Sequence, residues 1–159
     1  MMGALTPRAM PDLTELQRCT LAAVAERILP SEDGPGALET GAASYVAAAL
    51  SEERLRDWGP LFTHGLDQIE EIAHQALGMD FSAAGPDQQD DVLHRLQSLP
   101  EPAIRHFFTR LIRFCVEGFV GPPGSGGNRD GLGWRSVGYP PDGMDIDGCR
   151  SAGPAQETP

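Results

Sequence analysis

The chain has 159 residues, with 23 acidic and 12 basic side chains and a formal net charge of −11 at pH 7. A field of that sign repels polyanions, which excludes nucleic acid and anionic membrane surfaces as expected partners. Every basic residue other than histidine is arginine, and the lack of lysine excludes P-loop, Schiff-base and Ser-Lys chemistry. This length favours one domain with a proper core.

The first predicted helix begins at Thr14, because Thr14 and Gln17 have the spacing of a capping box, and it ends before Pro30. Its apolar side chains repeat at helical spacing and form the stripe Leu21, Val24, Ala25 and Ile28. A short alanine-rich helix is expected near residues 40–50. The N-terminal third of the chain therefore reads as helical.

The third predicted helix covers residues 53–77 and ends at Gly78, and Gly59 and Pro60 are expected to kink its first turns. Its apolar face consists of Trp58, Phe62, Ile69, Ile72, Ala73 and Ala76. A fourth helix begins at Pro86, a favourable first-turn residue. Its inward-facing residues are Val92, Leu93 and Leu96.

The fifth predicted helix, residues 102–118, is the most apolar one in the chain. Its apolar residues cover a wide arc and are Ile104, Phe107, Phe108, Leu111, Ile112, Phe114, Cys115 and Phe119. Such an arc indicates several neighbours and predicts the central helix of a bundle. Residues 121–159 hold 10 of the 19 glycines and 6 of the 14 prolines, which predicts loop. The expected fold is all-α, a small bundle of about five helices with a long Gly/Pro-rich C-terminal loop.

Two carboxylate–histidine pairs have the spacing that di-iron bundles use, namely Glu71 with His74 and Asp91 with His94. Helical geometry places both pairs opposite the apolar faces of their helices, and a ligand set for a buried metal must point inward. We therefore expect no metal site at these pairs. No nucleophile–base pair is visible in the sequence either, so we expect no catalytic residues. A stand-alone metal-binding protein or enzyme using these pairs is kept as the alternative function, and a small helical domain without an obligate partner as a third.

The segment 118–140 is glycine-dense and yet contains Asn128, Arg129, Asp130, Trp134 and Tyr139. Glycines allow close backbone approach, and Trp, Tyr and Arg are frequent interface anchors, which predicts a partner-binding loop. The same residues also suit a loop that packs back on its own bundle. Physical reasoning leaves both interpretations open.

This segment resembles the gluconate 2-dehydrogenase subunit 3 family. The similarity rests on Leu21–Pro30 with Asp33-Gly-Pro-Gly-Ala37, and on Glu117-Gly-Phe through Gly138-Tyr-Pro140. Its most specific part is the signature Gly-Gly-Asn-Arg-Asp-Gly-x-Gly-Trp at Gly126–Trp134. The similarity covers residues 13–141, which we expect to be a helical domain between a flexible N-terminus (1–12) and a disordered tail (142–159).

The resemblance implies a non-catalytic small subunit that binds, stabilises and matures an FAD-dependent, glucose–methanol–choline (GMC)-type sugar or polyol dehydrogenase. FAD would belong to that large subunit and no cofactor to this chain, and a cytochrome c subunit is a further expected partner. The partner-binding residues expected from these interpretations are Gly127, Asn128, Arg129, Asp130, Gly131, Trp134 and Tyr139.

The resemblance implies a twin-arginine leader, with which many members of that family begin. The N-terminus departs from this pattern, because residues 1–13 contain one arginine, Arg8, and no apolar run typical of an export signal. The least polar stretch, residues 41–50, is far shorter than the roughly 20 residues that span a bilayer. We expect a cytoplasmic protein without direct membrane insertion, with export to the periplasm alongside its partner as the alternative. Cys149, in the polar tail, is a candidate intersubunit thiol.

Overall fold

The computed structural model describes residues 13–52 and 55–139. Within these ranges the chain forms α-helices and short 3-10 turns, and no strand. The α-helices are α1 (Glu15–Ile28), α2 (Ala37–Thr40), α3 (Ala42–Ser51), α4 (Gly59–Leu77), α5 (Pro86–Gln97), α6 (Pro102–Val120) and α7 (Leu132–Ser136). The 3-10 turns are η1 (Arg56–Trp58), η2 (Phe81–Ala83), η3 (Pro123–Ser125) and η4 (Arg129–Gly131). The predicted all-α bundle is confirmed.

The start of α1 follows the predicted capping box. Thr14 Oγ1 accepts from the Gln17 backbone N–H at 3.1 Å, and Gln17 Oε1 accepts from the Thr14 N–H at 3.0 Å. The Gln17 side chain also donates to Asp67 Oδ1 at 2.8 Å, so the cap joins α1 to α4. Leu21, Val24 and Ala25 are buried as expected.

Helix α4 corrects the prediction of a kinked helix over residues 53–77. The described part begins with the separate 3-10 turn η1, and α4 starts at Gly59 with Pro60 in its first turn. A proline there removes no helical hydrogen bond, so nothing needs to kink. Phe62, Ile69 and Ala73 are buried, but Ala76 is exposed.

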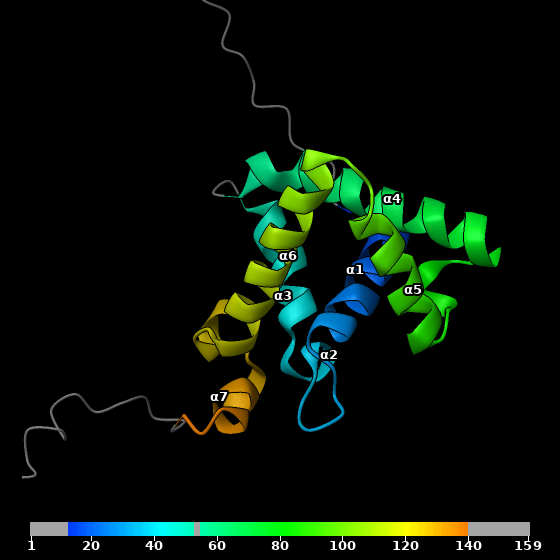
Figure 1. Ribbon diagram of the computed structural model, residues 1–159. Helices are drawn as coiled ribbons and strands as arrows, with labels where there is room; N and C mark the ends of the chain where they lie inside the picture. Colours follow the sequence, from blue (N-terminus) through cyan, green and yellow to red (C-terminus); the bar gives the residue numbers. More distant parts are fainter. Residues whose placement is uncertain (1–12, 53–54, 140–159) are drawn as a thin grey trace, which may run out of the picture.

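Helix α6 is the centre of the bundle and contacts each of the other six α-helices. Figure 1 shows it beside α3, with α7 at its C-terminal end. Phe62 of α4 packs against Phe107 and Phe114 of α6, with ring centroids 5.5 and 5.7 Å apart. The predicted arc is too wide, however, because Ile112 is 45% exposed.

The C-terminal segment also departs from the predicted loop, because residues 123–136 fold into η3, η4 and the short helix α7. A high glycine count indicates that the preceding helix ends, but it cannot show that the chain then folds back and packs against the bundle. No helix within the described ranges is both long and apolar enough to cross a bilayer.

The close crossing of α3 and α6 gives the first prediction. A Cβ added to Gly118 would lie 2.9 Å from Tyr45 Cδ1 and 3.0 Å from Ala42 Cα, so Gly118→Ala must push α3 and α6 apart. We expect the free energy of unfolding, measured in urea, to fall by roughly 1–3 kcal/mol. Gly124→Ala is the matched control, because a Cβ at Gly124 meets nothing within 4 Å. Equal stability of the two variants would contradict close packing here.

Candidate functional site

The signature segment closes onto the C-terminal end of α6, and Asn128 holds it there. The Asn128 side chain is fully buried, its Nδ2 donates to the Gly121 carbonyl, and its Oδ1 accepts from the Gly133 N–H, both at 2.8 Å. Asn128 adopts a left-handed backbone with φ 46°, a conformation that asparagine tolerates better than most residues. One side chain thus joins Gly121, at the start of the segment, to Gly133 in α7. We call residues 121–139 the capping segment.

Two glycines of the signature allow the capping segment to approach α6 at backbone distance. A Cβ at Gly127 would overlap the carbonyl oxygen of Gly118, and a Cβ at Gly133 would overlap that of Phe119. Gly131 is buried and has φ 68°, a left-handed conformation that favours glycine. These positions require glycine for steric reasons.

Trp134 continues the contact with α6. Its indole Nε1 donates to the Val120 carbonyl at 2.6 Å, and its ring lies 5.2 Å from the ring of Tyr139. Both aromatic residues are half-buried. The last carbonyls of a helix have no partner within the helix, so Trp134 satisfies one of these groups.

Arg129 and Asp130 are the exposed residues of the predicted set. Arg129 lies over Gly41, and its Nη2 is 3.5 Å from Ser44 Oγ. The Asp130 carbonyl accepts from Arg135, a residue that sequence reasoning did not single out. The capping segment therefore presents charged side chains outward while its buried residues hold it on the bundle.

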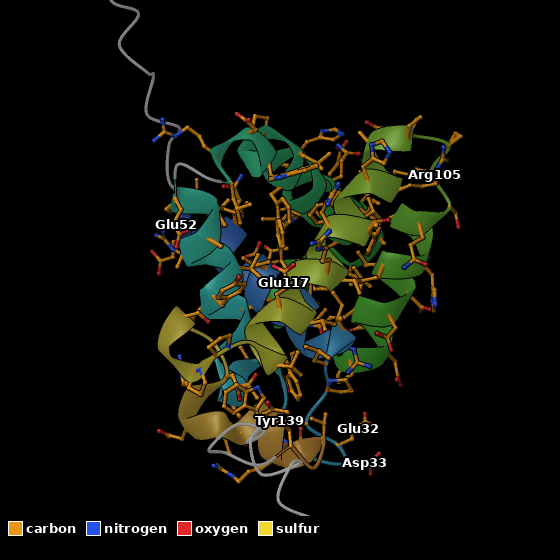
Figure 2. All side chains as sticks on the ribbon, turned by 90° about the vertical axis from the view of Figure 1, so that its left-hand side faces the viewer. Glu32, Asp33, Glu52, Arg105, Glu117 and Tyr139 are labelled. Atoms are coloured by element: carbon orange, nitrogen blue, oxygen red, sulfur yellow. The ribbon has the colours of Figure 1, made fainter. Side chains whose placement is uncertain are left out.

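The seven predicted partner-binding residues do come together in this one segment. Gly127, Asn128 and Gly131 are buried and build it, whereas the others reach its surface. The loop packs back on its own bundle, as the second interpretation expected, through the side chains of Asn128 and Trp134 at the end of α6, while Arg135 bonds within the segment. Whether the exposed residues bind a partner stays a prediction. Figure 2 shows Tyr139 at the opposite end of the molecule from Arg105, with Glu117 of α6 between them.

The candidate metal pairs lie on the surface, as predicted. Glu71, His74, Asp91 and His94 are all exposed, and Glu71 accepts hydrogen bonds from Gln68 and Gln75. His74 instead lies beside Asp80 and Glu70, with Nε2–oxygen distances of 2.9 and 3.9 Å.

Glu70 is the buried carboxylate that sequence reasoning missed. It accepts from Thr20 Oγ1 at 2.5 Å and from the Phe81 N–H at 3.2 Å, and so joins α4 to α1 and η2. The ligand atoms of Glu70, His74 and Asp80 lie within 4.8 Å of one another, the arrangement closest to a metal site among the described residues. The sequence did contain a sign that Glu70 is buried. It lies four residues after Leu66 and three before Ala73, on the same face of the helix as these buried residues.

The described cysteines differ in exposure. Cys19 is exposed, whereas Cys115 is buried in α6, and burial raises the pKa of its thiol to about 12. Because the thiolate is the reactive form, Cys115 serves as a small core residue. Cys149 lies outside the described residues, and its role stays a prediction.

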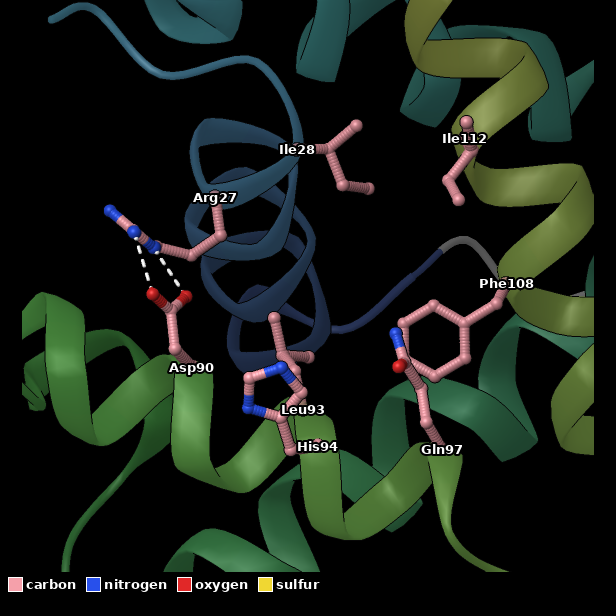
Figure 3. Close-up of a pocket in the computed structure, with 8 residues that line it drawn as sticks. All are labelled: Arg27, Ile28, Asp90, Leu93, His94, Gln97, Phe108 and Ile112. Atoms are coloured by element: carbon pink, nitrogen blue, oxygen red, sulfur yellow. Dashed lines mark hydrogen bonds and ion pairs between the residues drawn. The ribbon is translucent and has the colours of Figure 1, made fainter.

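An open groove of about 280 Å³ lies between α1, α5 and α6. Figure 3 shows Ile28 and Ile112 on its opposite sides, and its other lining residues are Arg27, Asp90, Leu93, His94, Gln97 and Phe108. Arg27 binds Asp90 through two parallel hydrogen bonds of 2.8 Å. These bonds hold the pKa of the Asp90 carboxyl below its usual 3.8 and raise the pKa of Arg27.

The Asn128 bridge predicts the effect of a nearly isosteric change. Asn128→Asp replaces the Nδ2 donor with an oxygen facing the Gly121 carbonyl, so the free energy of unfolding should fall by roughly 1–3 kcal/mol. Hydrogen exchange should also become faster in residues 121–136. The reciprocal change Asp130→Asn, at an exposed neighbour that also has positive φ, should alter stability by less than about 0.5 kcal/mol. Similar stability of both variants would refute the bridge.

The Arg27–Asp90 pair predicts a pH dependence. Because the folded pKa of Asp90 is lowered, its stabilisation is present above about pH 3.8 and is lost as the pH falls through the folded value. Asp90 is 40% exposed, so solvent screening limits the loss in Asp90→Asn at neutral pH to at most about 1 kcal/mol. The free energies of unfolding of wild type and variant, measured in urea, should converge once the pH falls below the folded pKa of Asp90. Asp91→Asn, at an exposed residue of the same helix, should show no such difference.

Comparison with known proteins identifies one family. The family model for gluconate 2-dehydrogenase subunit 3 matches residues 15–141, which include the whole bundle from α1 to α7 and the capping segment. Searches of curated proteins and of solved structures give no match to this chain. The residues that build the capping segment are those on which the resemblance rested. The chain belongs to the gluconate 2-dehydrogenase subunit 3 family.

Proposed function

We propose that this chain is the non-catalytic small subunit of an FAD-dependent, GMC-type dehydrogenase complex that acts on CH–OH groups of sugars or polyols. The observation that carries the proposal is the family match across residues 15–141. FAD and substrate would be bound by the large subunit, and a cytochrome c subunit would be a second partner. The chain's own task is to bind the large subunit.

The capping segment supports a binding role because it is held in one conformation before any partner arrives. Asn128, Trp134 and Arg135 each tie it by a hydrogen bond, so little conformational entropy remains to be lost on binding. In this segment Arg129 and Asp130 are exposed, and Trp134 and Tyr139 are half-buried. Arginine and large aromatic residues are the side chains that most often anchor interfaces.

Binding would also account for stabilisation and maturation of the partner. A subunit that binds only the folded, flavin-loaded state of the dehydrogenase stabilises that state by mass action. No chemical step by this chain is needed for that effect. The large subunit would therefore catalyse the reaction, and the small subunit would shift the folding equilibrium of the large subunit toward its folded state.

Co-purification tests this function. When the tagged chain is expressed with its neighbouring genes, we expect a yellow complex that contains FAD and reduces dye, while the chain alone is colourless and inactive. Arg129→Ala should weaken the complex about tenfold, because it removes an exposed anchor. Arg95→Ala, at an exposed arginine of α5, should not.

Elution of the chain as a colourless monomer despite soluble co-expressed dehydrogenase would overturn the proposal. Flavin and activity in the chain purified alone would overturn it equally. Metal analysis of the same preparation addresses the alternative function, since iron or manganese bound in stoichiometric amount would favour a metal protein.

A further inference from the structure

One face of α6 remains uncovered although α6 is the central helix of the bundle. Its residues recur at i, i+4, i+7, i+11 and i+15, all five are exposed, and they are Arg105, Thr109, Ile112, Val116 and Val120. We call this set the outer face of α6. Its three apolar members are 45, 43 and 38% exposed, although the exposed side of such a helix is normally polar.

The outer face is continuous with the groove and with the capping segment. Ile112 forms one side of the groove between α1, α5 and α6. Val120 lies at the other end, where its carbonyl accepts from Trp134 of the capping segment. A partner that covers the capping segment can therefore extend along α6 into the groove without leaving the apolar stripe.

Charge is distributed unevenly between this region and the rest of the chain. Residues 102–139 contain five arginines and two acidic residues, a net charge of +3, whereas the remaining residues carry seven arginines and 21 acidic residues, a net charge of −14. Arg105, Arg113, Arg129 and Arg135 are all exposed. Arg113 pairs with Glu117 at 2.9 Å, which leaves Arg105 as the charge at the N-terminal end of the outer face.

We propose that the outer face of α6 is the docking surface for the large dehydrogenase subunit, and that the partner presents apolar side chains bordered by carboxylates there. This inference rests on the proposed function and adds the location and the chemistry of the interface. Apolar residues on the partner would cover Ile112, Val116 and Val120, and carboxylates would meet Arg105 and the arginines of the capping segment. Complementary charge at the rim mainly sets the association rate and the orientation of the partner.

A second copy of this chain suits the same face less well. A two-fold dimer places identical patches against each other, so residues 102–139, with their net charge of +3, would face a second copy of the same charge. Like charges at an interface cost free energy and select against that pairing. The net positive charge of residues 102–139 on an otherwise acidic chain therefore points to a different, acidic protein surface.

The test uses the tagged chain and the flavoprotein that co-purifies with it, defined by FAD absorbance. Val116→Glu puts a charge in the middle of the apolar stripe and should lower the amount of captured flavoprotein about tenfold or more. Leu16→Glu is the matched control, because Leu16 is 42% exposed on α1, outside the outer face. Both substitutions place a good helix former at an exposed site, and circular dichroism checks that both variants fold.

A charge reversal provides an independent readout that leaves the apolar stripe unchanged. Arg105→Glu should slow association and reduce its dependence on salt, whereas Arg95→Glu makes the same charge change on α5 and should have no effect. Capture that is unaffected by both Val116→Glu and Arg105→Glu would overturn this inference and leave the proposed function standing. Failure of the wild-type chain to capture any flavoprotein would overturn the proposed function itself. A dimer of the lone chain that Val116→Glu dissociates would also refute the assignment of this face to the dehydrogenase.

Discussion

The structure depends on how the C-terminal end of α6 is satisfied. A helix leaves its last carbonyls without internal partners, and α6 is the helix against which all the others pack. Here the Val120 carbonyl accepts a hydrogen bond from the Trp134 indole, and the Gly121 carbonyl accepts one from the Asn128 side chain. Gly127 and Gly133 lie against the carbonyls of Gly118 and Phe119. The most specific motif of the sequence therefore serves first to end the central helix, and the surface it presents is a consequence of that role.

Much of the fold could be predicted because helix starts and apolar periodicity are local signals. The capping box at Thr14, the start of α5 at Pro86 and the inward residues of α5 are found as expected. The error at Pro60 has a local cause too, because the apolar pattern continues before the proline, while the helix can begin only one residue ahead of it. Sequence spacing located the element correctly and misplaced its boundary.

The site was harder to predict because its interactions are not periodic. Asn128 forms hydrogen bonds with Gly121 and Gly133, and neither position belongs to a periodic sequence pattern. Arg27 and Asp90 lie far apart in the chain and meet only after α1 and α5 pack. Sequence reasoning named residues of the capping segment, yet it could not separate those that build the segment from those that reach solvent, since that division is set by the backbone turn.

Exposed valine and isoleucine on a central helix require a reason beyond the stability of this chain. A bundle stabilised for itself alone gains nothing from leaving Ile112, Val116 and Val120 at the surface, and such patches favour association. The capping segment ends α6 without covering that face, although it lies within reach of Val120. Arg105 and Arg113 are exposed on the same helix, while the acidic residues are concentrated outside residues 102–139. Exposed apolar side chains and a net positive charge thus occur in the same part of the chain, and an acidic partner with apolar contacts accounts for both.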